Sequence, residues 1–160
     1  MIQLRRAEER DLPAMLRLSD EIQELHVQGE PQVYHRGEAE ERRAWYAGKL
    51  AEDAWFWVAE DGGGLVGLLL LQRMDRPANP FTAARSWLMV DQLVVGREAQ
   101  RRGVGQALMA QAEREARTLG LDRLELDVRA FNRAAIGFYE ALGYRPTALR
   151  MYRSLTGEGE

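Results

Sequence analysis

The stretch from Asp91 to Ala110 reads DQLVVGREAQRRGVGQALMA and joins a predicted strand to a predicted helix. The apolar run from Trp87 to Val95 predicts the strand, and the alanine-rich sequence from Val104 onward predicts the helix. Between them lies a turn, Gln100 to Gly105, with glycines at 103 and 105. A helix N-terminus exposes unpaired backbone N–H groups, and glycine lets an anion approach them. The turn is therefore a candidate phosphate site, although glycines before a helix also serve packing alone.

Two common nucleotide-binding motifs do not fit this turn. No Gly-Lys-Ser or Gly-Lys-Thr follows it, so it is not a P-loop. Position 108 is leucine, so the third glycine of the dinucleotide-binding fingerprint is absent. The turn instead resembles the pyrophosphate-binding motif of the GCN5-related N-acetyltransferases (GNAT). That motif is Gln or Arg, two variable residues, Gly, one variable residue, then Gly or Ala, and Gln100 to Gly105 fits each fixed position.

A second segment also resembles this family. Residues 132–144 read NRAAIGFYEALGY, which is similar to a family signature of an asparagine, a Phe-Tyr pair and a closing Gly-Tyr or Gly-Phe. The resemblance covers nearly the whole chain. It implies one domain over residues 1–155 of the α/β (α+β) class, followed by a frayed tail at 156–160. The implied sheet is mixed and mostly antiparallel, with about six to seven strands flanked by about four helices.

Local patterns predict the order of the other elements. Asp11 is expected to cap the first helix, and Asn132 to cap the last helix, which Gly143 closes. Residues 76–80 contain two prolines and are expected to form a surface loop. The remaining predicted elements are a strand near residues 2–4, helices over 11–26 and 38–51, strands over 55–59 and 65–71, a helix from 104 to 120, a strand over 124–128, a helix over 132–142 and one or two strands within 144–155.

Composition excludes several classes of protein. The net charge of -3 argues against a nucleic-acid partner, because phosphate binding relies on excess basic charge. The chain has no cysteine, which excludes disulfides and a thiol nucleophile, and its two histidines have no metal-binding spacing, so no metal is expected. The longest apolar run, residues 65–71, is too short to cross a membrane, and residues 1–9 show neither the apolar core nor the small-residue cleavage site of a signal peptide. We therefore expect a cytoplasmic protein with no membrane partner.

The resemblance implies acetyl-CoA as the acyl donor. Backbone groups of residues 93–95 would pair with the pantetheine arm as an added strand would, and N–H groups of residues 101–106 would hold the pyrophosphate. Asn132 would contact the cofactor, a role that is compatible with capping its helix. The implied cofactor residues are Leu93, Val94, Val95, Gln100, Arg101, Arg102, Gly103, Val104, Gly105, Gln106, Asn132 and Phe138.

Two residues are candidates for proton transfer. By resemblance, Tyr139 is the general acid that protonates the departing CoA thiolate, whereas a tyrosine taken alone is more often a packing residue. An amine acceptor must also lose a proton, which costs roughly 4 to 5 kcal/mol at pH 7 for a pKa near 10.4. Alternation predicts that Met89, Asp91 and Leu93 share one face. By resemblance, Asp91 lies where polyamine-type members of the family carry an acidic residue, so Asp91 is the base candidate. An ordinary aspartate is a poor base for ammonium, so Asp91 could instead only hold the cation or lie at the rim of the site.

The acceptor expected from these features is a primary amine of a small molecule, polyamine-like or amino-acid-like. Its pocket is expected near residues 26–45, residues 76–85 and the last strands. Alternatives are acetylation of a protein N-terminus or lysine, and a non-catalytic acyl-CoA sensor. Because family members often dimerise, a homodimer is expected. Five side chains could attract a cationic amine or stack on it: Glu24, Glu30, Asp75, Tyr34 and Trp87. The alternative is that they are ordinary surface charges and core aromatics.

Overall fold

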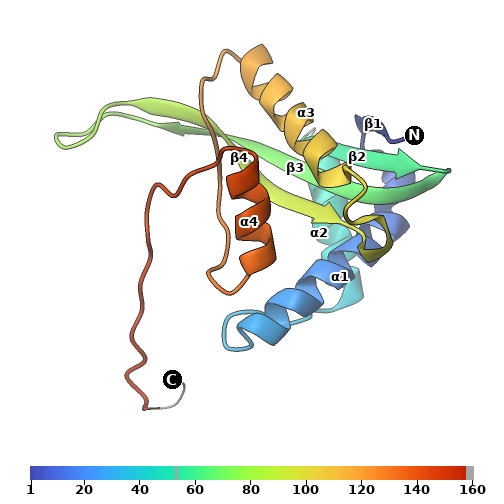
Figure 1. Cartoon of the computed structure of the whole chain (residues 1–160), viewed down its shortest axis with the longest axis horizontal. Coiled ribbons are helices and arrows are strands. Elements are labelled where there is room, and N and C mark those ends of the chain that lie inside the picture. The colour runs from blue at the N-terminus through green and yellow to red at the C-terminus, as the bar shows by residue number, and fades with distance from the viewer. Residues whose placement is uncertain (53, 158–160) are drawn as a thin grey trace. The chain divides into compact units, whose positions relative to one another are not determined.

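The computed structural model describes residues 1–52 and 54–157. The chain divides into two compact units, one over residues 1–127 and one from residue 128 onward. The strands are β1 (Gln3–Arg6), β2 (Trp55–Asp61), β3 (Gly64–Arg76), β4 (Arg85–Val95) and β5 (Leu124–Leu126), all in the first unit. The helices are α1 (Leu12–Gly29), α2 (Ala39–Ala51) and α3 (Val104–Thr118) in the first unit and α4 (Arg133–Ala141) in the second (Figure 1). Two 3-10 turns, η1 (Glu9–Asp11) and η2 (Arg97–Ala99), precede α1 and α3.

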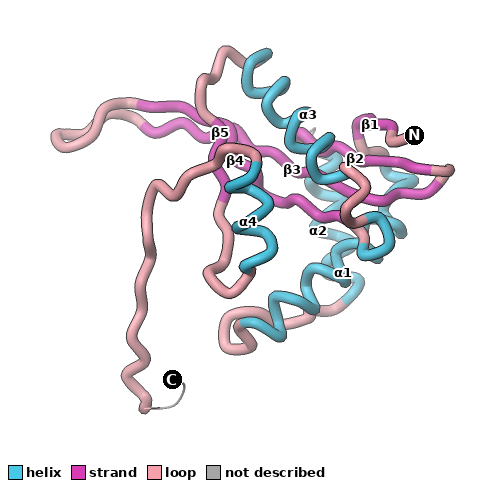
Figure 2. Tube along the Cα trace, in the orientation of Figure 1, coloured by secondary structure: helices cyan, strands magenta, loops and turns pink. Residues whose placement is uncertain are grey.

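The sheet has the order β1-β2-β3-β4-β5, in which the first four strands are antiparallel and β5 is parallel to β4. The mixed α/β class is confirmed, but the described sheet has five strands rather than six to seven. The strands expected within residues 144–155 are absent, and Figure 2 shows this segment as loop. A loose alternation of side chains does not make a strand unless another backbone pairs with it. Residues 158–160 of the expected frayed tail lie outside the described residues.

Helices cover both faces of the sheet in the first unit (Figure 1). On the face of α1 and α2, one cluster of buried side chains forms the core: Leu12, Met15, Leu18, Tyr46, Phe56, Val58, Leu68, Leu70 and Val94. On the opposite face, α3 buries Val104, Leu108, Met109, Ala112 and Ala116. The apolar spacing of the sequence predicts a buried face of Val104, Leu108, Ala112, Ala116 and Leu119, and this is confirmed except for Leu119, which is partly exposed. None of the described helices combines the length and apolar character needed to cross a bilayer.

The start of α1 differs from the prediction in its capping. Asp11 directly precedes the helix, but its carboxylate makes no cap hydrogen bond to α1. It accepts the backbone N–H of Glu8 at 2.8 Å and both terminal nitrogens of the Arg5 guanidinium at 2.8 Å. The buried carboxylate thus joins β1 to α1, because a charged partner from another element binds it more strongly than the helix N–H groups do.

Gly67 of β3 sets how closely α3 packs on the sheet. A Cβ atom there would lie 2.9 Å from Val104 Cγ1, 3.0 Å from Leu108 Cδ1 and 3.0 Å from the carbonyl oxygen of Val94. We expect Gly67→Ala to lower the free energy of unfolding by about 1–3 kcal/mol, because the first turn of α3 must move outward. Denaturant unfolding measures this change.

Gly48, inside α2, provides the matched control. No atom lies within 4 Å of the position that its Cβ would take. Gly48→Ala should therefore raise the free energy of unfolding by about 0.5–1 kcal/mol through helix propensity alone. If both variants unfolded at the same denaturant concentration, close packing at Gly67 would not limit the position of α3.

In the second unit, α4 begins and ends as its sequence predicts. The Asn132 side chain accepts the backbone N–H of Ala135 at 3.1 Å, which confirms the predicted cap. Gly143 has φ 94, and its N–H donates to Glu140 O at 2.9 Å. The N–H of Tyr144 donates to Tyr139 O at 3.0 Å, which completes a Schellman motif. The closing Gly-Tyr of the signature is therefore a helix stop that folds Tyr144 back onto Tyr139.

Candidate active site

The turn from Gln100 to Gly105 forms a row of free hydrogen-bond donors at the start of α3. Across residues 1–52 and 54–157, no backbone N–H from Arg101 to Gln106 has an acceptor. The first helical bond of this region runs from Ala107 N to Gly103 O at 3.0 Å. Six successive donors at the positive end of a 15-residue helix form a site for a phosphate or pyrophosphate.

Two residues of this turn have left-handed backbones. Gly103 has φ 83, and a Cβ there would meet no atom within 4 Å. Arg101 has φ 64, an uncommon conformation for a residue with a side chain. Alternation between left- and right-handed backbone turns successive N–H groups toward the same side, as in anion-binding nests. The open space at Gly103 therefore lies where a bound anion would approach the backbone.

The two arginines of the turn differ in their partners. Arg102 forms an ion pair with Asp61, the last residue of β2. The ammonium of Met1, which lies 3.1 Å from the same carboxylate, and the Arg102 guanidinium hold the pKa of Asp61 below its usual value. Arg101 is exposed and has no ion pair with the described residues. Its guanidinium is therefore the one available to an incoming anion without breaking an internal pair.

The outer edge of β4 is open directly before this turn. Strand β5 pairs with β4 only from Leu88 to Val90. No described strand pairs with that edge between Asp91 and Val95, whereas the other edge is paired with β3. An extended chain can therefore add along residues 93–95 and lead toward the free N–H groups of residues 101–106. This arrangement fits the pantetheine arm and pyrophosphate of CoA.

A β-bulge places Asp91 between the two halves of β4. Leu70 pairs with Gln92 and Leu71 with Val90, so Asp91 is an extra residue without a partner on β3. Beyond the bulge, Leu93 pairs with Leu69, whereas before it Met89 pairs with Gln72. Because Leu69 and Gln72 are three residues apart on β3, Met89 and Leu93 lie on opposite faces. The prediction that Met89, Asp91 and Leu93 share one face is therefore wrong.

Asp91 itself is exposed at this bulge. Its carboxylate makes no hydrogen bond or ion pair with any residue that the structure describes. An unpaired, solvated carboxylate next to an open strand edge can bind an ammonium group or exchange a proton with it through water. The structure therefore leaves both chemical roles of Asp91 available.

Gln92, the residue after Asp91, is held by a hydrogen bond from α2. The hydroxyl of Tyr46, on α2, donates to Gln92 Oε1 at 2.8 Å, and burial raises the pKa of Tyr46. Tyr46 is 3% exposed and packs against Phe56, with ring centroids 5.7 Å apart. This bond joins α2 to β4 beside the bulge. The exposed Asp91 therefore lies on a strand that the buried Tyr46 holds in place.

In the second unit, Asn132 caps α4, and Phe138 and Tyr139 lie near the other end of that helix. The Tyr139 ring lies edge-on to Phe138 and to Tyr144, with ring centroids 5.2 and 5.9 Å away. Burial raises the pKa of Tyr139 to about 12, so its phenol stays protonated at neutral pH. Tyr139 thus carries the proton that the predicted general acid would donate. That it acts on the same thioester as Asp91 stays a prediction.

At least four of the five side chains expected to attract or stack on an amine have partners within the protein. Glu24 accepts two bonds from the Arg36 guanidinium at 2.8 Å, and Asp75 accepts the Ser86 hydroxyl at 2.5 Å as well as Arg73. The Tyr34 ring stacks on His26 with centroids 4.8 Å apart. The guanidiniums of Arg85 and Arg76 lie 3.9 and 5.5 Å from the centroid of the buried Trp87 ring. Structural roles account for these four side chains.

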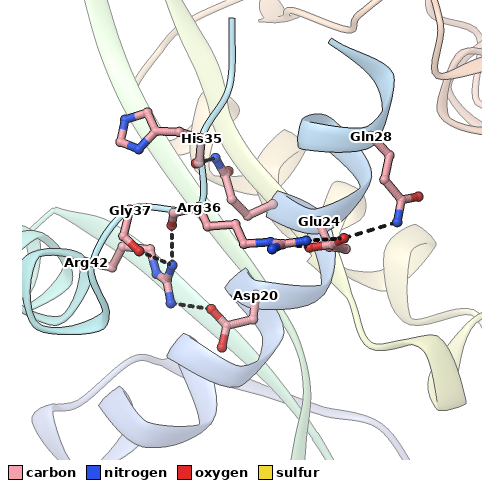
Figure 3. Close-up of polar contacts among 8 residues, drawn as sticks. Asp20, Glu24, Gln28, His35, Arg36, Gly37 and Arg42 are labelled. Carbon is pink, nitrogen blue, oxygen red and sulfur yellow. Dashed lines mark hydrogen bonds and ion pairs between the residues drawn. The ribbon is translucent and has the colours of Figure 1, made fainter. Parts of the chain in front are cut away.

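Figure 3 shows the charged contacts that hold the segment connecting α1 to α2, residues 30–38. Asp20 and Glu24 of α1 bind Arg42 and Arg36, at 2.5 and 2.8 Å respectively. Gln23 donates to the backbone carbonyl of His35 at 2.6 Å. Gln23 and Glu24 therefore hold this segment, which lies within residues 26–45, where part of the acceptor pocket is expected, and Asp20 joins α1 to α2.

Sequence reasoning missed four residues that shape this site: Glu21, Tyr46, Asp61 and Gln92. Their contacts join positions 41 to 76 residues apart, namely Asp61 with Arg102, Tyr46 with Gln92 and Glu21 with Arg97. Neither spacing nor periodicity signals such pairs. Among the described side chains, moreover, no three His, Cys, Asp or Glu residues are grouped so that they could bind a metal ion.

Comparisons with known proteins identify relatives of this chain. Residues 19–144 match the family described as Acetyltransferase (GNAT) family. Probable N-acetyltransferase camello of Xenopus tropicalis is 29% identical over 106 residues, which are 66% of this chain and 45% of that protein. The ribosomal protein bS18-alanine N-acetyltransferase of Salmonella typhimurium is 39% identical over 67 residues, which are 42% of this chain and 45% of that protein. The aligned parts thus span less than half of each of these relatives.

Solved structures share the fold. A tetramutant of the BH1408 protein from Bacillus halodurans matches with a TM-score of 0.90 at 21% identity, covering 96% of this chain and 99% of that one. An aminoglycoside antibiotic 6'-N-acetyltransferase from Acinetobacter haemolyticus matches with a TM-score of 0.75 at 18% identity, covering 95% and 97%. At these identities the matches establish the arrangement of elements and not the substrate.

Proposed function

Because the chain belongs to the acetyltransferase (GNAT) family, we propose that it transfers the acetyl group of acetyl-CoA directly to a primary amine of a small molecule. The observation that carries this proposal is the row of free N–H groups from Arg101 to Gln106, which continues from the open edge of β4. An extended arm followed by a pyrophosphate fits this pair of features. Asn132 and Phe138 of the second signature are proposed as further cofactor contacts.

In the proposed reaction, bound acetyl-CoA supplies a thioester whose carbonyl carbon is open to attack by an amine. The backbone N–H groups near Leu93 or Val94 donate to the carbonyl oxygen as it gains negative charge. Tyr139 donates its phenolic proton to the departing sulfur. Because a thiol of pKa about 8.5 is already a fair leaving group, this proton transfer contributes less than it would for an alcohol. The acetyl group passes directly from acetyl-CoA to the amine, without a covalent acyl-enzyme intermediate.

Asp91 is proposed to receive the acceptor. Its free carboxylate at the bulge would attract an ammonium group and pass its proton to solvent through water. The net charge of -3 and this unpaired aspartate favour a cationic small molecule. The likeness to an aminoglycoside acetyltransferase in fold is consistent with that class and does not select it.

A second candidate is acetylation of a protein N-terminus. It is favoured by the 39% identity over 67 residues to the Salmonella typhimurium enzyme that is named for the alanine of ribosomal protein bS18. The two candidate functions differ in the size of the acceptor. Activity with different acceptors therefore distinguishes them, whereas cofactor binding does not. A non-catalytic acyl-CoA sensor is the third outcome to be tested.

The deciding experiment follows CoA thiol release from acetyl-CoA with polyamines, amino acids, aminoglycosides and alanine-terminated peptides as acceptors. We expect amine-dependent release with at least one small-molecule class. Release with peptides alone would replace the small-molecule acceptor by a protein N-terminus. Tight CoA binding without amine-dependent release would identify a sensor.

Replacing Asp91 tests its proposed role. We expect Asp91→Ala to lower kcat/KM for the amine about tenfold and to shift the pH dependence of the rate, because the carboxylate relays the proton of the ammonium. The measurement is the rate from pH 6 to 9 at saturating acetyl-CoA. An unchanged pH profile with a raised amine KM would reduce Asp91 to a cation-binding residue.

Asp75→Asn provides the control for this prediction. Asp75 is also an exposed aspartate of the first unit, but Arg73 and Ser86 already bind its carboxylate. It should therefore leave both the rate and the pH profile within about twofold of the wild type, as expected for an exposed paired charge. An equal loss in both variants would indicate an effect of net charge.

A further inference from the structure

The short turn of residues 96–99, between β4 and the turn from Gln100 to Gly105, is fixed by contacts from two elements. Gly96 donates its N–H to Val66 O of β3 at 2.9 Å. The position of a Cβ on Gly96 would lie 3.1 Å from Leu18 Cδ2 of α1, so the helix packs directly against the turn. Ala99, at the end of η2, is 2% exposed. The path of the chain into Gln100 is therefore determined by packing on α1 and β3.

Glu21 supplies the polar part of this contact. Its Oε2 accepts the backbone N–H of Arg97 at 2.8 Å, across 76 residues of sequence. Glu21 and Leu18 are three residues apart, so they lie on the same face of α1. The Arg97 N–H is the first donor of η2 and has no carbonyl partner, and a carboxylate gives it a charge-assisted bond. One face of α1 thus holds Gly96 by packing and Arg97 by hydrogen bonding.

The neighbouring carboxylates of α1 have different partners. Asp20 binds Arg42 of α2, and Glu24 binds Arg36 of the connecting segment 30–38 (Figure 3). Of the three acidic side chains in this turn of α1, Glu21 is the one that accepts a hydrogen bond from the turn 96–99. The contact is therefore separable by mutation from the contacts that hold the connecting segment.

We propose that Glu21 is a positioning residue for acetyl-CoA. By holding the Arg97 N–H, its carboxylate fixes the direction in which the chain leaves β4, and so keeps the N–H groups of residues 101–106 directed to one side. The effect is on cofactor affinity and not on the chemical step, because Glu21 acts through the backbone of Arg97 and not on the reacting atoms. This inference rests on the proposed use of acetyl-CoA.

Three variants of the full chain test it: Glu21→Ala, Glu21→Gln and Glu24→Ala as the matched control. Calorimetry gives the Kd of acetyl-CoA, and steady-state rates separate KM from kcat. We expect Glu21→Ala to raise the Kd and the acetyl-CoA KM about five- to tenfold, with kcat within about twofold, because only part of the free energy of the lost charge-assisted hydrogen bond is passed on to cofactor binding. Glu21→Gln keeps an acceptor oxygen and should stay within about threefold of the wild type.

Hydrogen exchange of residues 97–106 gives a readout that needs no ligand. Glu21→Ala should speed exchange of the Arg97 amide and of the following loop, whereas Glu24→Ala should leave both exchange and acetyl-CoA affinity unchanged. Equal acetyl-CoA affinity in wild type and Glu21→Ala, or equal losses in Glu21→Ala and Glu24→Ala, would overturn the inference. If the wild type itself bound no acetyl-CoA, the proposed function would fail, and unchanged exchange in Glu21→Ala would separately reject the positioning role.

Discussion

Gly103→Val should weaken acetyl-CoA binding by at least about 100-fold while the protein stays folded. Gly103 has φ 83, and the space around its missing Cβ is open, so the valine side chain would occupy the approach to the free N–H groups of residues 101–106. Hydrogen bonds to a charged group contribute about 1.5–3 kcal/mol each. Loss of one or two of them corresponds to about 100-fold in affinity. Calorimetric titration with acetyl-CoA measures this effect.

Gly120, at the other end of α3, gives a matched control. It has φ 70 and also has no atom within 4 Å of a Cβ position. Gly103→Val and Gly120→Val should therefore lower the free energy of unfolding by similar amounts, about 1–3 kcal/mol for a side chain in left-handed backbone. Only Gly103→Val should lose affinity for acetyl-CoA. Equal affinity in the two variants would show that the cofactor pyrophosphate does not bind at the start of α3.

Tyr139→Phe should lower kcat about 10- to 100-fold and leave the acetyl-CoA KM within about threefold. The substitution removes the proposed proton donor but keeps the ring that packs beside Phe138 and Tyr144. Because the pKa of Tyr139 is raised to about 12, the wild-type phenol should remain protonated up to pH 10. Its deprotonation should therefore not lower the wild-type rate in that range. The test is steady-state kinetics from pH 7 to 10.

Tyr144→Phe removes a hydroxyl from the same aromatic group and should change kcat by less than about threefold. A full rate in Tyr139→Phe would leave the tyrosine a packing role only. The raised pKa also affects stability, because the unfolded chain loses the phenolic proton near pH 10 and the folded chain near 12. The contribution of Tyr139 to stability is thus complete below pH 10 and is lost as the pH rises to about 12.

Several features of the fold followed from short sequence patterns. Asn132 and Gly143 mark the two ends of α4 as predicted, because a cap and a helix stop depend on backbone groups within a few residues. The apolar spacing from Val104 to Ala116 predicted the buried face of α3, because 3.6 residues per turn relate sequence position to direction. The prediction of strands within residues 144–155 was wrong, because a strand needs a backbone partner from a distant segment, which no local pattern supplies.

The candidate site shows the same division. The sequence by itself determined the turn from Gln100 to Gly105 and the family to which the chain belongs, because glycine positions and signatures are local. Only the tertiary structure decided that a bulge isolates Asp91, that β5 leaves the edge of β4 open beyond Val90, and that Glu21 holds the Arg97 N–H. These features depend on strand register and on contacts between distant segments, which form only when the whole unit packs.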